Sequence, residues 1–222
     1  MGKLGIITIG QSPRIDLTED LVNILNENIT VIERGILDNY TYQEVIDNFK
    51  PSHGEKMLVS RMKDGREVKL SEKKITDCMQ ECIIDLEKDV DMILILCTGR
   101  FPKYNHNKPL LIPQEILHSI VSKLSNEKEI GVIIPKDEQI DSITNWWEES
   151  GIKIQVKTAS PYKDIETIEN VSKHFKNKDI EYIILDCMGY SQAMKEIVKT
   201  RSQKMVILPR TLIARIINEL II

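Results

Sequence analysis

The sequence predicts an α/β protein made of two similar parallel-sheet lobes, related by a pseudo-twofold duplication, with a cleft between them. Strand-like aliphatic runs alternate with helical patterns along most of the 222 residues, and parallel strands need such crossover connections. In addition, the run EYIILDCMG at 181–189 repeats the pattern of DMILILCTG at 91–99. A repeated strand end within one chain favours duplicated lobes over one continuous sheet.

Strands are expected at the aliphatic runs KLGIITIG, NITVIERGI, DMILILC, EIGVIIP, IKIQVKTAS, EYIILDC and KMVILP. Helical patterns fill most of the intervals between these runs. One segment departs from the alternation, because in EKMLVSRMKDGREVKL two short β-rich runs flank Asp64-Gly65. An Asp-Gly pair between such runs predicts a β-hairpin at residues 56–70, inserted before the next helix.

The expected first lobe consists of residues 1–108 plus 207–222, and the second lobe of residues 109–206. The polar loop FPKYNHNKP is expected to lead from one lobe to the other. The last helix, TLIARIINELII, is expected to pack back on the first lobe, because several aliphatic side chains share one of its faces. They are Leu212, Ile213, Ile216, Ile217 and Leu220.

The composition of the sequence limits the kinds of partner that the protein is expected to bind. The net charge is −4 with acidic and basic residues interspersed, which argues against a nucleic-acid or acidic-membrane surface. The Met-Gly-Lys start lacks the apolar h-region of a signal peptide, and no apolar run reaches the length of a membrane span. We therefore expect a cytoplasmic protein with a small-molecule partner. The oligomeric state stays open, with a homodimer as one candidate.

The four cysteines fall into two kinds. Cys78 and Cys82 lie in the apolar stripe of an amphipathic helix and are expected to be small buried hydrophobes. Cys97 and Cys187 lie at the carboxyl ends of two predicted strands, each with a glycine two residues on. Ligands of open α/β sheets bind at this edge, so duplicated lobes would bring both thiols to one active-site cleft. The cysteine spacings do not indicate a metal site, and none is expected.

Several residues beside strand ends are candidates for substrate binding. Backbone and side chains of one loop after the first strand could hold a carboxylate, and arginines at strand ends could hold carboxylates by two-point contacts. The alternative for each arginine is a solvated or structural role. Tyr190 is the aromatic residue expected to line the site. The candidates are Gln11, Ser12, Arg14, Thr98, Gly99, Arg100, Met188, Gly189, Tyr190 and Arg210.

The strand ends LCTG and LDCMG resemble the two cysteine motifs of the aspartate/glutamate racemase superfamily, which includes hydantoin racemases, maleate isomerases and arylmalonate decarboxylases. The stretches GIITIGQSPRID, LDCMGY and LPRTLIARIINEL resemble the AroM family more closely. The superfamily resemblance implies that Cys97 and Cys187 act as a thiolate and thiol pair without a cofactor. A carboxylate beside a thiol disfavours the thiolate, so Asp186 fits this role only if its side chain lies on the other strand face.

The sequence departs from glutamate racemases at both motifs. Cys187-Met188-Gly189 stands where the second motif typically reads Cys-Thr-His, and Cys97-Thr98-Gly99 where the first often reads Cys-Asn-Thr. The expected function is therefore cofactor-independent racemisation or isomerisation of a small carboxylate other than a simple amino acid. Two alternatives stay open: a non-catalytic metabolite-binding protein, and a single-cysteine isomerase or decarboxylase of the same superfamily.

Overall fold

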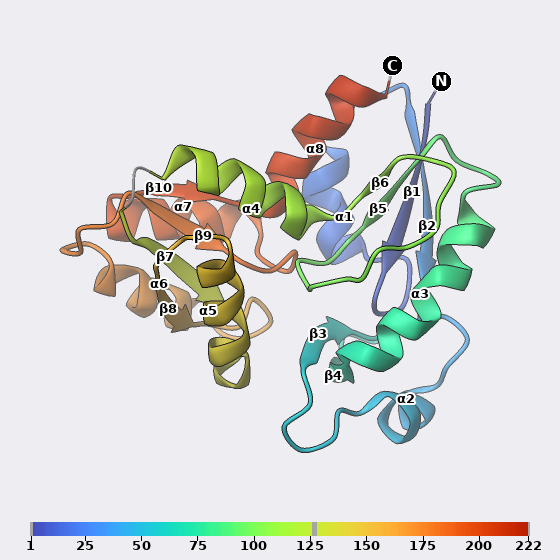
Figure 1. Cartoon of the computed structure of the whole chain (residues 1–222), viewed down its shortest axis with the longest axis horizontal. Helices are drawn as coiled ribbons and strands as arrows, with labels where there is room; N and C mark the ends of the chain where they lie inside the picture. The colour runs from blue at the N-terminus through green and yellow to red at the C-terminus, as the bar shows by residue number, and fades with distance from the viewer. Residues whose placement is uncertain (1, 126–127, 222) are drawn as a thin grey trace. The chain divides into compact units, whose positions relative to one another are not determined.

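The computed structural model describes residues 2–125 and 128–221 (Figure 1). The chain divides into two compact units, of which the first runs to Gln114 and resumes at Ala214, and the second is Glu115–Ile213. Each unit contains a four-stranded parallel sheet, which confirms the predicted α/β class with two parallel sheets. Within the described residues, no helix is both long enough and apolar enough to cross a membrane.

The sheet of the first unit has the strand order β2-β1-β5-β6. Its strands are β1 (Gly2–Thr8), β2 (Ile29–Gly35), β5 (Met92–Ile95) and β6 (Leu110–Leu111). The helices that belong to this unit alone are α1 (Ile15–Val22), α2 (Tyr42–Phe49) and α3 (Glu72–Leu86). The strands predicted at the first three aliphatic runs are all present.

Helix α3 covers one face of this sheet, and its predicted apolar stripe forms the core there. Ile75, Met79 and Ile83 are fully buried against sheet residues that include Ile7, Ile93 and Ile95. The two helix cysteines are only partly buried, which corrects the expectation that they are core residues. They lie at the flank of the stripe, because Ile75, Met79 and Ile83 follow each other at four-residue steps and take its centre.

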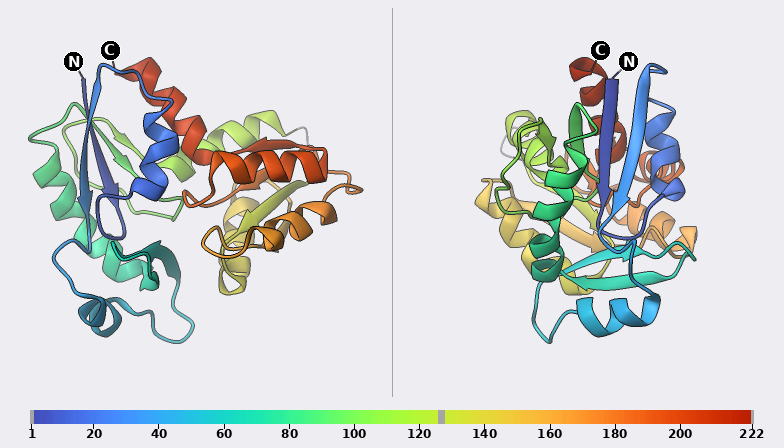
Figure 2. Two further views of the ribbon diagram at one scale, coloured as in Figure 1. Left: turned by 180° about the vertical axis from the view of Figure 1, so that it is seen from behind. Right: turned by 90° about the vertical axis from the view of Figure 1, so that its right-hand side faces the viewer.

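The inserted segment forms an antiparallel hairpin of β3 (Met57–Arg61) and β4 (Glu67–Ser71). Its turn contains Gly65 at φ +85°, a conformation that side chains other than glycine rarely adopt. Figures 1 and 2 show the hairpin beside the start of α3 and next to α2. The hairpin also contacts the loop after β1, where the Gln11 N–H donates to the Arg61 carbonyl at 3.3 Å.

The sheet of the second unit has the order β10-β9-β7-β8. Its strands are β7 (Ile130–Ile134), β8 (Ile154–Thr158), β9 (Tyr182–Leu185) and β10 (Met205–Ile207). The other elements in order are α4 (Pro113–Leu124), η1 (Asp137–Gln139), α5 (Ile140–Glu149), α6 (Ile165–His174), α7 (Gln192–Ser202) and α8 (Pro209–Leu220). Helices α6 and α7 cover one face, and α4 and α5 cover the other.

The two sheets have the same topology once β1, β2, β5 and β6 are matched with β7, β8, β9 and β10. Gly5 pairs with Ile93 as Gly131 pairs with Ile183. A Cβ at Gly5 would come within 2.7 Å of Leu86, and one at Gly131 within 2.9 Å of Ile180. Glycine therefore lets the covering helix and its following turn approach the sheet closely in both repeats.

Strand β6 is the element that the sequence pattern does not reveal. It pairs with β5 in the first sheet and leads into α4, as β10 leads into α8. The lobe boundary expected after residue 108 precedes this strand, whereas the structural boundary follows Gln114. The difference arises because β6 has only two residues and directly follows a polar loop.

Helix α8 packs against the first unit over its second half. The Asn218 side chain accepts from the Asn26 N–H at 2.8 Å and donates to the Ile24 carbonyl at 2.7 Å, next to the end of α1. Ile217 is fully buried, but Leu220 is 55% exposed, contrary to the expected face. The buried stripe is centred on Ile213, Ala214 and Ile217, which leaves Leu220 at its edge.

Candidate functional site

Cys97 and Cys187 occupy the same backbone turn in the two units. Each cysteine N–H donates to the carbonyl two residues earlier, Ile95 or Leu185, at 2.8 Å in both cases. Each sulfur accepts an N–H from the glycine two residues later, at 3.2 Å for Cys97 and 3.3 Å for Cys187. A hydrogen bond donated to sulfur favours the thiolate over the thiol.

The residue before each cysteine fixes the turn to the central strand of its sheet. The Leu96 N–H donates to the Ile7 carbonyl at 2.8 Å, and the Asp186 N–H donates to the Ile133 carbonyl at 2.9 Å. Both cysteine residues are partly buried, so they are neither sealed in the core nor fully exposed. The duplication seen in the sequence therefore extends to the hydrogen bonds of the two thiol sites.

Glycine is sterically required two residues after each cysteine. A Cβ at Gly99 would lie 2.6 Å from a Leu58 methyl group of the hairpin. A Cβ at Gly189 would lie 2.7 Å from the Tyr162 hydroxyl and 2.8 Å from the Pro161 ring. The glycines bring the N–H groups close to sulfur, and they also let the neighbouring segments approach the turns.

Asp186 points away from the face that holds Cys187. Its carboxylate accepts from Trp147 Nε1–H at 3.1 Å on the α5 side of the sheet, whereas Cys187 packs with the cluster under α6 and α7. Asp186 is 3% exposed and Trp147 is fully buried. The condition set by the sequence, that the carboxylate lie on the other strand face, is met.

His118 extends this buried polar group. Its ring stacks on Trp147 with centroids 3.8 Å apart, and its Nδ1 lies 2.7 Å from Ser150 Oγ. The fixed Trp147 ring in turn holds the Asp186 carboxylate on the α5 side of the sheet, away from Cys187. The sequence pattern does not reveal the hydrogen bond between Trp147 and Asp186.

Arg210 is 1% exposed and holds the Cys187 turn from inside the protein. Its Nε and Nη2 groups both donate to the Met188 carbonyl, at 3.0 and 2.5 Å. Met188 is 2% exposed and the neighbouring Gly189 is also buried. In this structure the guanidinium therefore acts on the backbone of the turn, which is the structural alternative considered for the arginines.

Tyr190 differs from its expected position as a site-lining residue. It is fully buried, and its hydroxyl donates to the Ala159 carbonyl at 2.7 Å. Burial, followed by the nearby Cys187 and Asp186, raises the pKa of Tyr190 well above its ordinary value. The ring packs into the cluster under α6 and α7, because the turn at Cys187 directs the chain inward.

The loop after β1 is held by protein groups. Gln11 Nε2 donates to the carbonyls of Leu37 and Tyr40, and Ser12 donates to Asp38 through its N–H and hydroxyl. The Arg14 fork binds both carboxylate oxygens of Asp16 at 2.8 Å, and Nη1 donates to Ser60. A ligand carboxylate would have to displace Asp16, so substrate binding by this loop stays a prediction.

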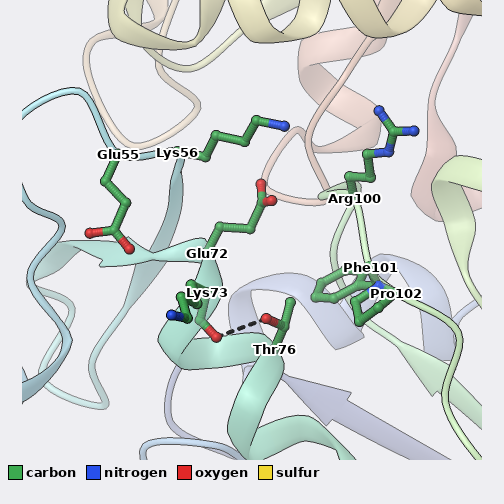
Figure 3. A pocket seen from close by; sticks show the side chains of 8 residues that line it. All are labelled: Glu55, Lys56, Glu72, Lys73, Thr76, Arg100, Phe101 and Pro102. Atoms are coloured by element: carbon green, nitrogen blue, oxygen red, sulfur yellow. Dashed lines mark hydrogen bonds between the residues drawn. The ribbon is translucent and has the colours of Figure 1, made fainter.

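Thr98 and Arg100 follow the same strand but differ in their exposure to solvent. Thr98 is 7% exposed, whereas Arg100 is exposed and borders a pocket of about 480 Å³ on the first unit. The other lining residues come from the start of the hairpin, the first turns of α3 and the chain after Arg100. They are Glu55, Lys56, Glu72, Lys73, Thr76, Phe101 and Pro102 (Figure 3).

The two helix cysteines have raised pKa values. Burial raises the pKa of Cys82 to about 11, with smaller and opposing effects of Arg34 and nearby carboxylates. Burial also raises the pKa of Cys78, and Asp77 and Glu81 add to the increase. Both thiols therefore stay protonated at neutral pH, which disfavours them as bases or nucleophiles.

Solved structures with the same fold include several enzymes. The maleate isomerase of Pseudomonas putida S16 matches with a TM-score of 0.66 and 12% identity, over 99% of this chain and 92% of that one. The Picrophilus torridus aspartate racemase gives 0.63 and 14%, over 99% and 94%. The glutamate racemase of Aquifex pyrophilus gives 0.58 and 20%, over 99% and 84%. At these identities the likeness establishes the fold.

A search of curated protein sequences found no match. A family model, described as AroM protein, matches residues 4–221 and thus nearly the whole chain. It includes both cysteine turns, the hairpin and the last helix, which confirms the resemblance noted in the sequence. The chain belongs to the AroM family, whose fold here is that of the aspartate, glutamate and maleate racemases and isomerases.

Proposed function

We propose that this protein catalyses the cofactor-independent racemisation or isomerisation of a small carboxylate, with Cys97 and Cys187 as the two proton carriers. The observation that carries the proposal is the duplicated turn, in which each sulfur accepts a glycine N–H at nearly the same distance. An unspecialised pair of structural cysteines has no need of matched donors. Two equivalent thiol sites suit a reaction that needs one proton carrier on each face of a carbon.

In the proposed reaction, the thiolate of one cysteine takes the proton from the carbon next to the carboxylate. The electron pair of the broken C–H bond moves onto the carboxylate as an enolate. The thiol of the other cysteine then donates its proton to the opposite face, so the centre inverts while thiol and thiolate exchange places. Reacting atoms lie about 3–3.5 Å apart in such a complex, which implies sulfurs on the order of 6–8 Å apart.

The similar proteins of known structure support the substrate class. Two of them are an aspartate racemase and a maleate isomerase, and aspartate and maleate are small dicarboxylates. The missing histidine after Cys187 favours a substrate other than a simple amino acid. The single-cysteine alternative is favoured by one asymmetry: only the Cys187 turn leads directly into a helix, α7, whereas Cys97 is followed by a loop up to β6.

The test is exchange with solvent deuterium. Small dicarboxylates, hydroxy acids and hydantoins are incubated with the protein in D₂O, and deuterium at the carbon beside the carboxyl or carbonyl group is followed by NMR together with optical rotation. Replacing either turn cysteine by alanine should abolish inversion, whereas Cys78→Ala and Cys82→Ala should retain it. Inversion that survives Cys97→Ala would establish the single-cysteine alternative, and binding without exchange would establish the metabolite-binding protein.

A further inference from the structure

The pocket of about 480 Å³ on the first unit is built by three segments that contribute charged side chains. Lys56 stands before β3, Glu72 begins α3, and Arg100 follows the Cys97 turn. Phe101 and Pro102 add an apolar wall. Its volume falls within the range of small-molecule sites, about 300–1,000 Å³.

Three of the lining charges face the same space. Figure 3 shows the Lys56 and Glu72 side chains both extending toward the side of the pocket on which Arg100 lies. In the described part of the chain, neither the Lys56 ammonium nor the Glu72 carboxylate makes a hydrogen bond or an ion pair at contact distance, and they act on each other only at longer range. Lys56 and Glu72 therefore lie in the same pocket but do not form a direct ion pair with each other.

The second acidic residue of the pocket, Glu55, already accepts hydrogen bonds from protein groups. The Glu55 carboxylate accepts from the Ser71 hydroxyl and from the Ser52 N–H, and Figure 3 shows it turned away from Glu72. Lys73 is exposed on α3. The cations that act on Glu72 are Lys56 from the hairpin side and Arg100 from the segment after Cys97, whereas Lys73 acts on Glu55. Two cations thus face one carboxylate in this part of the pocket.

We propose that this pocket binds a small organic carboxylate, held by Lys56 and Arg100, with its apolar part against Phe101 and Pro102. The inference rests on the proposed function for the ligand class, and it assigns binding to residues other than the cysteines. Arginine and lysine in one site suit this ligand, because the guanidinium offers a planar fork and the ammonium a point charge. The inserted hairpin then contributes directly to ligand selection through Lys56.

Glu72 makes the binding depend on pH. Burial raises the pKa of Glu72 above its ordinary value, although Lys56 and Arg100 pull it in the other direction. The ionised carboxylate repels the ligand, and the protonated acid does not. Because protonation of Glu72 becomes more complete as the pH falls through its raised pKa, a ligand that remains ionised should bind more tightly as the medium becomes more acidic.

The test is calorimetric titration with phenylacetate, compared with phenylacetamide as a neutral ligand of the same shape. Arg100→Gln and Lys56→Gln should each weaken phenylacetate binding about tenfold, the loss of one charged contact. Lys74→Gln removes the same charge from α3 at a residue that does not line the pocket. It should alter the affinity for phenylacetate by less than about twofold. Glu72→Gln should tighten binding at about pH 8 and remove most of the difference from about pH 5.

The proposal is overturned if wild-type protein does not bind phenylacetate, if phenylacetamide binds equally well, or if Arg100→Gln and Lys56→Gln both leave binding unchanged. Cys187→Ala separates this result from the proposed reaction. That variant should lose inversion but bind phenylacetate as wild type does. Loss of inversion alone therefore tests the cysteine pair, and unchanged phenylacetate binding in the Arg100 and Lys56 variants refutes the pocket alone.

Discussion

The buried hydrogen bond between Trp147 and Asp186 should stabilise the second unit measurably. Trp147→Phe keeps an aromatic ring stacked on His118 but removes the Nε1–H that donates to Asp186 at 3.1 Å. Hydrogen bonds to charged groups contribute about 1.5–3 kcal/mol, and the smaller ring adds up to about 1 kcal/mol of lost packing. We expect a loss of about 2–4 kcal/mol in the free energy of unfolding of this unit.

Urea unfolding followed by tryptophan fluorescence isolates this unit, because both tryptophans of the chain, Trp146 and Trp147, lie in α5. The remaining Trp146 reports on the variant. A double-mutant cycle with Asp186→Leu separates the hydrogen bond from packing, and its coupling energy should be about 1.5–3 kcal/mol. A coupling below about 0.5 kcal/mol, the limit of additivity for independent sites, would refute the reasoning.

Iodoacetamide at mildly alkaline pH should alkylate Cys97 and Cys187 before Cys78 and Cys82, and peptide mass spectrometry can locate the label. Early labelling of Cys82 would contradict its raised pKa. The protonated Cys82 thiol should stabilise the fold below its ordinary pKa of 9.0, and this contribution should be lost as the pH rises toward about 11, which urea unfolding against pH can detect. Gly189→Ala should destabilise by about 1–3 kcal/mol in thermal unfolding, because Pro161 is rigid at 2.8 Å, and Gly99→Ala should cost less because it meets a movable methyl group; equal effects would contradict this ranking.

Strand periodicity and the repeated cysteine motif sufficed to predict both parallel sheets. They work because buried parallel strands read as continuous aliphatic runs, and β7 and β9 are buried along nearly their whole length. Strand β6 was not predicted, because two residues are too few to show a periodic pattern. The flank positions of Cys78 and Leu220 show a related limit, since an apolar stripe identifies a face but does not fix its centre.

The candidate site was predictable where it depends on the backbone and not where it depends on distant side chains. The two cysteines and their glycines share a local turn, so the motif contains the information. By contrast, Tyr190 closely follows Cys187 and Arg210 follows a strand end, but both side chains are buried, which depends on the packing of α6, α7 and α8. Lys56 and Glu72 meet Arg100 only through tertiary structure, and isolated charged residues give no signal of that convergence.

The placement of α4 and α8 bears on how the duplication arose. Helix α4 follows the last strand of the first sheet but contributes Leu117 and Val121 to the core of the second unit, and α8 continues from the second sheet into the first unit. The repeats thus exchange their terminal helices in the manner of a domain-swapped dimer fused into one chain. A single repeat taken alone would therefore lack the terminal helix that the other repeat supplies.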